Sequence, residues 1–373
     1  MKTPPFCPNQ DCKYHQTAPA GSTWFVRHGR FQSAARGAIQ RYRCKACGRH
    51  FSSQTFSLDY MTQRTISYRK IFELLHTASG IRDIARILKA SPHCITDRIS
   101  RLARQALAVH ADLLDSLELK EDLVADGFES FAVSQYFPNN IQLLAGKESQ
   151  YWIFSDYAHL RRKGRMTAYQ KKRNTILQAK FIYDRVTIYK SFEELVRQAL
   201  FLKEKTPHTT TALFTDEHRQ YRKVMMNLSD GERSVLQHRT CSSKRARSLT
   251  NPLFSVNYLD REIRKDLAEH TRESMQFARN VVNQMERLAI YRLYHNYWKP
   301  YRINGQNEYM RTHAEEAGIC SELIQREMKT FFTQRRFLSR VRGMMSRDRC
   351  VWLKNVATPL KRGVDYLPEY SWA

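Results

Sequence analysis

Four cysteines near the start of the chain form two close pairs, and this spacing constrains the fold more than any other feature. Cys7 and Cys12 lie in the stretch CPNQDC, and Cys44 and Cys47 lie in RYRCKACGRHF. Each short loop between cysteines forms a knuckle, and two knuckles together supply the four sulfur ligands of a tetrahedral Zn²⁺ ion. We therefore expect residues 1–55 to form a small zinc ribbon around a structural Zn²⁺. The alternative, four unrelated buried cysteines, fits the pairing less well.

The balance of charge indicates a polyanionic partner. The 373 residues carry a formal net charge of +26, and the pI is near 9.9. Nucleic acid is the favoured partner, because each phosphate neutralised by Lys or Arg releases condensed counterions. No apolar run approaches the roughly 18 residues that a membrane-spanning helix needs, and the first residues lack the apolar segment of a secretory signal. We expect a cytoplasmic protein that makes no membrane contact.

Residues 56–115 are expected to hold a helix-turn-helix. The apolar spacing predicts one helix over 66–78 that ends at Gly80, and two further helices follow in IRDIARILKA and SPHCITDRISRLARQAL. Ser91 is expected to cap the last of these, with Pro92 as its first residue. Such a helix presents its outward side chains to DNA; here they are His93, Thr96, Arg98, Arg101 and Arg104. The alternative is a plain helical hairpin with a solvated basic face.

Two aspartates follow apolar runs that read as strands. Asp126 ends the run in DLVAD, and Asp216 ends the run in TTTALFTD. Carboxylates brought together repel each other unless a cation lies between them, and Mg²⁺ or Mn²⁺ is the cation that oxygen ligands prefer. The pair therefore predicts a catalytic metal site at the ends of two strands. Asp156 also ends an apolar run and is the main rival, although a turn or a helix cap explains it as well.

A third acid is expected from a helix that follows. In VNYLDREIRKDL the helical spacing puts Asn257, Asp260 and Arg264 on one face, while Glu262 lies on another side. Glu262 neighbours the apolar position Leu259, so an inward orientation of its side chain also stays open. Asp260 and Glu262 therefore both stay candidates for the third metal ligand.

These motifs together resemble a known family. The stretches CPNQDC with RYRCKACGRHFS, VADGFESF, FTDEHRQY and NPLFSVNYLDREIRKDLAEHTRESMQFARN resemble bacterial insertion-sequence transposases, which have a zinc ribbon, a helix-turn-helix and an RNase H-like catalytic domain with a DDE-type acidic triad. The resemblance implies that Asp126 and Asp216 are the first two catalytic acids. It leaves Asp260 and Glu262 equal for the third position, with Asn257 behind them because an amide binds Mg²⁺ more weakly than a carboxylate.

The resemblance also implies a function. Such an enzyme cuts a DNA strand at the element end with Mg²⁺ and then joins the freed 3′-hydroxyl to target DNA. Its partners are double-stranded DNA, as terminal repeats and as target, and further copies of the chain in a homodimer or larger assembly. It is found on the bacterial nucleoid when bound to DNA. The rival is a catalytically inactive, sequence-specific DNA-binding regulator derived from a transposase.

The expected fold class is a multidomain α+β or α/β chain. After the ribbon and the helix-turn-helix come an RNase H-like mixed-sheet domain over 116–300 and a basic helical region over 301–373. The third domain contains a basic insertion, RRKGRMTAYQKKR, which has no acidic residue. Its first part is expected to contact the DNA backbone, with a solvated loop as the alternative; the residues are Arg161, Arg162, Lys163 and Arg165.

Overall fold

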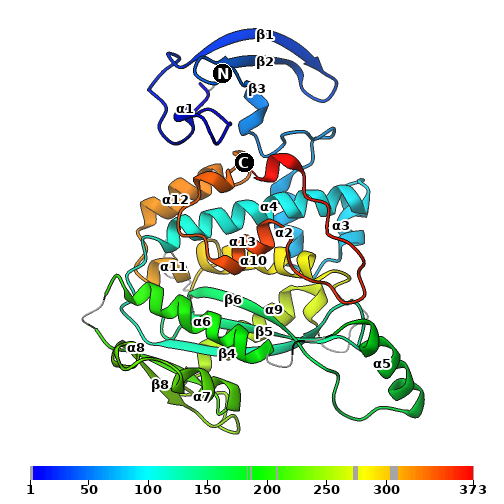
Figure 1. Cartoon of the computed structure of the whole chain (residues 1–373), viewed down its shortest axis with the longest axis vertical. Coiled ribbons are helices and arrows are strands. Elements are labelled where there is room, and N and C mark those ends of the chain that lie inside the picture. The colour runs from blue at the N-terminus through cyan, green and yellow to red at the C-terminus, as the bar shows by residue number, and fades with distance from the viewer. Residues whose placement is uncertain are drawn as a thin grey trace.

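The computed structural model describes residues 3–182, 184, 187–206, 209–271, 276–302 and 310–372. These residues form a mixed α+β structure with one small antiparallel sheet and one larger mixed sheet. Figure 1 shows the small sheet at one end of the molecule, above a body in which helices surround the larger sheet. The α+β class expected from the sequence is thus confirmed at this coarse level.

The N-terminal unit is a three-stranded antiparallel sheet of order β1-β2-β3. Tyr42 and Phe51, which flank the second cysteine knuckle, are cross-strand partners in this sheet. Trp24 stacks on Phe51, and four buried aromatic residues make a small core with three of the cysteines. The elements of the unit are β1 (Phe25–Ser33), β2 (Gly37–Cys44), β3 (His50–Ser52) and the short helix α1 (Lys13–Gln16).

The larger sheet has the order β6-β5-β4-β7-β8. Strands β4, β5 and β6 are antiparallel neighbours, whereas β7 pairs parallel with β4 and β8 pairs parallel with β7. The central strand is therefore flanked by one antiparallel and one parallel partner. The strands are β4 (Leu123–Phe131), β5 (Pro138–Gly146), β6 (Trp152–His159), β7 (Thr211–Thr215) and β8 (Leu236–Thr240).

Alternation along β4 divides the hydrophobic core between the two faces of the sheet. Leu123 and Ala125 belong to one cluster, and Val124 and Phe128 belong to the other. The first cluster also contains Ile71 and other side chains of the expected helix-turn-helix, so the core continues across the border predicted near residue 115. The helices before that border therefore pack as part of the body.

The helices agree with the predicted segments in type, with two differences at their ends. Ser91 caps α4 by accepting a hydrogen bond from the Cys94 amide, and Pro92 opens the helix as expected. The helix predicted over 66–78 is shorter, and Gly80 is the N-cap of α3 rather than the end of α2. The main helices are α2 (Tyr68–Leu75), α3 (Ile81–Ile87), α4 (Pro92–Leu114), α5 (Ala168–Lys180), α6 (Thr187–Lys203), α7 (Arg219–Met226), α8 (Asp230–Val235), α9 (Phe254–Asp266), α10 (Val281–Tyr297), α11 (His313–Glu316), α12 (Ser321–Thr330) and α13 (Ser346–Trp352).

The C-terminal segment joins the ribbon to the body. Phe6 of the ribbon packs edge-on against Phe337, and the Arg340 guanidinium lies over the Phe6 ring. The ring of His15 is buried, with Nε2 2.8 Å from Ser339 Oγ. No helix in the described ranges is both long and apolar enough to span a membrane.

Candidate metal centres and basic surfaces

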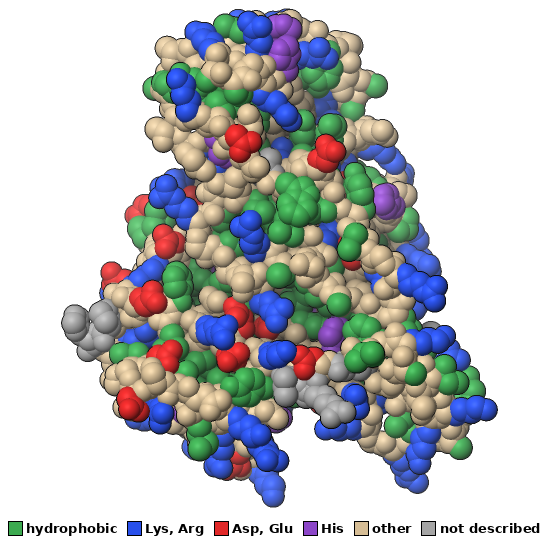
Figure 2. All heavy atoms as spheres, in the orientation of Figure 1, with side chains coloured by type: hydrophobic (Ala, Val, Ile, Leu, Met, Phe, Trp, Pro, Cys, Tyr) green, Lys and Arg blue, Asp and Glu red, His purple; other side chains and the backbone are tan. Residues whose placement is uncertain are grey.

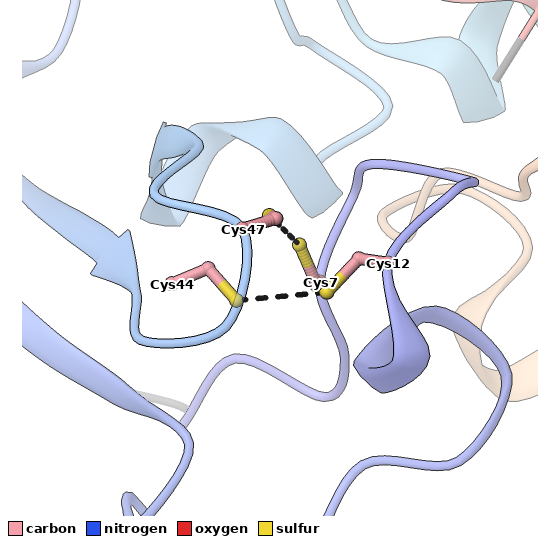
Figure 3. Close-up of side chains that lie close together, drawn as sticks. All are labelled: Cys7, Cys12, Cys44 and Cys47. Atoms are coloured by element: carbon pink, nitrogen blue, oxygen red, sulfur yellow. Dashed lines mark hydrogen bonds between the residues drawn. The ribbon is translucent and has the colours of Figure 1, made fainter.

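The four cysteines of the ribbon converge on one point. Figure 3 shows their sulfur atoms turned toward one another, two from the N-terminal segment and two from the turn between β2 and β3. Cys7 Sγ lies 3.6 Å from Cys47 Sγ, and Cys12 Sγ lies 3.7 Å from Cys44 Sγ. A tetrahedral zinc with sulfur ligands at about 2.3 Å requires sulfurs about 3.8 Å apart. The cluster is therefore compatible with a structural Zn²⁺.

Local backbone geometry holds these knuckles. Cys12 is the N-cap of α1, and the Gly48 amide donates to the Cys44 carbonyl to close the second turn. Gly48 has a φ of +70°, a conformation that other L-residues adopt only at a cost. The sequence thus specifies this centre with residues that lie close together in the chain.

Asp126 and Asp216 lie on neighbouring parallel strands. Leu123 pairs with Leu213 and Val124 with Phe214, so each aspartate stands at the same offset from its paired residues. Asp216 directly follows β7, as predicted. The prediction that Asp126 ends its strand is wrong, because β4 continues to Phe131 by pairing with β5. The apolar run ends at the aspartate, but the backbone ladder does not.

The helix α9 brings one predicted acid into the same region. Asn257, Asp260 and Arg264 all line a cavity that Asp126 also lines, in keeping with the shared helical face. Arg264 Nε donates to Asp260 Oδ1 at 2.7 Å and its Nη2 donates to the Glu129 carbonyl at 3.0 Å. The carboxylate of Asp260 thus faces the cavity region with a cation already beside it.

Glu262 is held elsewhere. Its carboxylate accepts hydrogen bonds from Lys299 and, at 3.1 Å, from Lys265. Burial opposes the charge of this group, but the two ammonium groups outweigh burial and lower the pKa of Glu262. Glu262 does not line the cavity that contains Asp126.

The cavity beside Asp126 has a volume of about 570 Å³. This size lies within the range of ligand pockets in proteins. Its wall combines aromatic rings, carboxylates and two guanidinium groups, and includes Asp126, Phe128, Glu129, Phe131, Gln135, Arg247, Asn257, Asp260, Arg264, His270 and Phe277. Asp216 is not part of this wall, but it lies close enough to act on Asp126 electrostatically.

The carboxyl group of Asp126 is strongly perturbed. Burial, followed by the charges of Asp216 and Asp260, raises the pKa of Asp126 to about 7, against the opposing effects of the Gly127 amide and Arg247. Burial together with the charges of Asp126 and Asp216 also raises the pKa of Tyr221. The charges of Asp216 and Asp260 thus both act on Asp126, and we refer to the three residues as the aspartate cluster. A bound cation would reduce the repulsion among their carboxylates.

The three carboxylates are less tightly gathered than the cysteines. In the part of the chain that the structure describes, the four cysteines are the one group of three or more such ligands whose atoms all lie within 4.8 Å of one another. The like charges of these partly exposed carboxylates favour this wider spacing, because each approach raises the energy of the ionised forms.

Arg247 lies on the loop between β8 and α9 and lines the cavity. The buried side chain of Asn251 shapes this loop by donating to the Ala246 carbonyl at 2.8 Å and accepting from the Leu253 amide at 2.9 Å. The Asn-Pro dipeptide at 251 and 252 is a turn signal that marks the loop, although it does not say where the arginine points.

The rival acid Asp156 is separate from this cluster. It lies within β6, not at a turn or a helix cap, and it is buried. Arg347 Nε lies 3.1 Å from its Oδ1, while burial raises the pKa of Asp156 to about 6 despite that arginine. The alternative reading as a turn or cap residue was therefore wrong, and the group has a structural ion pair.

Three arginines predicted to face DNA are buried. Arg98 donates to the Arg64 carbonyl at 2.8 Å, and Arg101 donates to the Tyr60 carbonyl at 2.7 Å. Arg104 is also buried, and burial lowers its pKa. The prediction that these three side chains lie outside on α4 is corrected, because segments distant in sequence cover that part of the helix; Tyr370 near the C-terminus, for example, lies under Arg101.

The first turn of α4 remains accessible. His93 is exposed and Thr96 is partly exposed. Next to them is an open groove of about 730 Å³ at the turn between α3 and α4. Its charged side chains are all basic, a feature that the sequence reading passed over: Arg64, Arg82, Arg86 and Lys89.

The predicted basic contacts of the insertion lie just before α5. Arg161, Lys163 and Arg165 are exposed, and Arg162 stacks over the Tyr136 ring. Three of the four, Arg165 excepted, line a cavity of about 720 Å³. The three basic residues in its wall are Arg161, Arg162 and Lys163. This cavity shares Glu129, Phe131 and Gln135 with the cavity beside Asp126, so the two cavities adjoin.

No protein-family model matches this chain, and no curated protein matches it.

Proposed function

We propose that the chain is a DNA transposase of an insertion sequence, with a DDE-type acidic site. The observation that carries the proposal is geometric: Asp126 and Asp216 lie on neighbouring parallel strands, and Asp260 of α9 lines the same cavity as Asp126. The mixed sheet under this cluster is consistent with the RNase H-like domain that the motifs imply. The net charge of +26 supports DNA as the substrate.

The residues present fit a divalent cation. Asp126 and Asp216 are the two ligands expected from neighbouring strands, and we propose Asp260 rather than Glu262 as the third because Glu262 is paired with two lysines. Bound Mg²⁺ or Mn²⁺ would supply activation of the attacking oxygen and stabilisation of the leaving oxygen. Arg247, on the same cavity wall, is positioned to neutralise a phosphate oxygen of the strand.

The remaining parts have supporting roles in this proposal. The ribbon and the groove at the turn before α4 would hold the element end, since both present basic side chains to solvent. A homodimer or larger assembly would pair two element ends. The 3′-hydroxyl freed by hydrolysis would then attack a phosphodiester of target DNA and displace the 3′-oxygen of the target strand, without a covalent protein intermediate.

A second candidate is a DNA-binding regulator that has lost the chemistry. The ion pair between Asp260 and Arg264 favours it, because the third carboxylate already has a cation at 2.7 Å. For the transposase, Arg264 must release or share that carboxylate when metal and DNA bind.

Cleavage of labelled DNA tests the proposal. The substrate is duplex DNA that carries the genomic sequences flanking the coding sequence, with Mg²⁺ as the metal. The variants are Asp126→Asn, Asp216→Asn and Asp260→Asn, and Glu262→Gln is the matched control from the same helix. We expect cutting to fall by a factor of about 10³ or more in the three aspartate variants, as when a preorganised transition-state contact is lost.

The outcomes separate the candidates. If the native chain cuts DNA and Asp260→Asn abolishes cutting while Glu262→Gln does not, Asp260 is the third ligand. If Glu262→Gln abolishes cutting and Asp260→Asn does not, our assignment of the third acid is wrong. Binding without cutting in every protein, at any Mg²⁺ concentration, identifies the regulator.

A further inference from the structure

The helix α5 projects from the body as a basic arm. Between Asp156 and Asp184 the sequence has eight Lys and Arg residues and no acid. Figure 1 shows α5 at the lower right, reached by a long connection from β6, and Figure 2 shows Lys and Arg side chains projecting there while Asp and Glu gather elsewhere on this face. We name residues 161–180 the basic arm. Its charged residues are Arg161, Arg162, Lys163, Arg165, Lys171, Lys172, Arg173 and Lys180.

The cations of the basic arm lack acidic partners within the described residues. The two acids that flank the run are paired elsewhere, Asp156 with Arg347 and Asp184 with Lys190. Arg173 donates to the Tyr169 hydroxyl, and Arg162 has a shielded Nη1 without a hydrogen-bond partner. Some exposed cations elsewhere in the chain do form ion pairs, as Arg197 does with Glu193.

The arm also lacks the packing that normally stabilises a helix. None of the residues of α5 is buried. Its C-terminal end contacts the body, where Leu177 packs against Tyr136 and Phe137. An isolated helix of this length is marginal in water, and the arm concentrates positive charge that repels itself without an acidic counterpart. A polyanionic partner would remove the repulsion and stabilise the helix.

The position of the arm connects it with the acidic cluster. The cavity at the base of the arm, lined by Arg161, Arg162 and Lys163, adjoins the cavity that Asp126 and Asp260 line. A phosphodiester backbone bound at the base of the arm would therefore lie next to the cavity of the proposed catalytic acids. The helix is about 20 Å long, which corresponds to about six base pairs of duplex.

We propose that the basic arm binds the phosphodiester backbone of duplex DNA, at a site separate from the groove at the turn before α4. This inference rests on the proposed function for the identity of the partner, DNA, and it does not require that the chain cut DNA. The arm supplies affinity without sequence preference, because its cations contact phosphates rather than base edges. DNA binding also orders the helix.

Binding of a fluorescein-labelled duplex of random sequence to the full-length protein tests the site. The arm variant is Lys171→Gln/Lys172→Gln/Arg173→Gln, since Gln keeps helix propensity while removing charge. The matched control is Lys120→Gln/Arg197→Gln/Arg233→Gln, which removes equal charge from exposed residues that already pair with Glu118, Glu193 and Asp230. The dissociation constant is measured between about 50 and 200 mM salt.

We expect the arm variant to lower the slope of log affinity against log salt by about 2 to 3, whereas the control leaves it near the native value. Amide exchange in α5 should slow on addition of DNA in the native and control proteins. If the arm and control variants show equal slopes of log affinity against log salt while both still bind and cut DNA, this inference is overturned and the proposed function is not. If the native chain binds no duplex at all, the proposed function fails together with it.

Discussion

The cysteine cluster and the aspartate cluster are two solutions to the same problem of holding a cation. The cysteines come from the segment before β1 and from the end of β2 with the turn that follows it, and their sulfurs already lie 3.6 to 3.7 Å apart in pairs. The aspartates come from β4, from the end of β7 and from α9, and they stay farther apart. Neutral thiols tolerate close approach, whereas carboxylates repel. The ribbon is thus built around its ligands, while the acidic site depends on the whole fold.

The largest effect is expected at the ribbon. Cys44→Ser removes one sulfur, and because the unit has only a small core, loss of the metal should unfold it. Structural zinc contributes on the order of 10 kcal/mol to small metal-dependent folds. Atomic absorption should give one Zn²⁺ per native chain and close to none for the variant, with β1 to β3 amides exchanging rapidly. Cys350→Ser, outside the cluster, is the control and should keep its zinc.

Sequence reasoning reached these two centres to different depths. The spacing of the cysteines is enough to predict their cluster, since each of the two pairs is close in the chain and forms one knuckle. The apolar runs before Asp126 and Asp216 are enough to pair these two residues, although hydrophobicity alone does not reveal that β4 continues past Asp126. Choosing between Asp260 and Glu262 required Lys299, which reaches Glu262 from beyond α10. Such a contact is a property of the folded chain.

The arginines of α4 show the same limit. Periodicity placed Arg98, Arg101 and Arg104 on the polar side of a helix, which was reasonable for the helix alone. In the folded chain, backbone carbonyls before α2 and the ring of Tyr370 cover them. The basic residues of α5 have no such cover. Charge in a sequence therefore predicts a binding surface only where no other segment buries it.

The second effect concerns the charge of Asp126. An ordinary aspartate has a pKa of 3.8, and this one is raised to about 7 by burial and then by Asp216 and Asp260. The folded state therefore binds the proton more tightly, and metal-free stability should fall as pH rises from about 4 to 7, by up to about 4 kcal/mol. In Asp126→Asn this loss should be absent. Urea unfolding in EDTA at several pH values measures it, and an unchanged slope in the variant would show that the pKa of Asp126 is not raised in the folded chain.

Added Mg²⁺ should offset part of that loss. A ligand that binds only the folded state at about 100 times its dissociation constant stabilises by about 2.7 kcal/mol. The gain should be greater at pH 8 than at pH 5, because Asp126 is ionised only at the higher pH. Thermal unfolding with and without Mg²⁺, in the native chain and in Asp216→Asn, measures it. An equal gain in both proteins would place the binding of Mg²⁺ outside the acidic cluster.

The smallest effect separates the two acids of α9. Glu262 is buried and bonded to Lys299 and Lys265, so Glu262→Gln should cost about 2 kcal/mol at neutral pH, since hydrogen bonds to charged groups are lost. Because its pKa is lowered in the fold, this contribution is present above the unfolded pKa and disappears as pH falls, opposite in sign to that of Asp126. Asp260→Asn disrupts a partly exposed pair and should cost less than about 1 kcal/mol. Yet Asp260→Asn should abolish the stabilisation by Mg²⁺, while Glu262→Gln should retain it. A variant pair with the reverse behaviour would move the third ligand to the other side of the helix, and with it the path of the DNA strand.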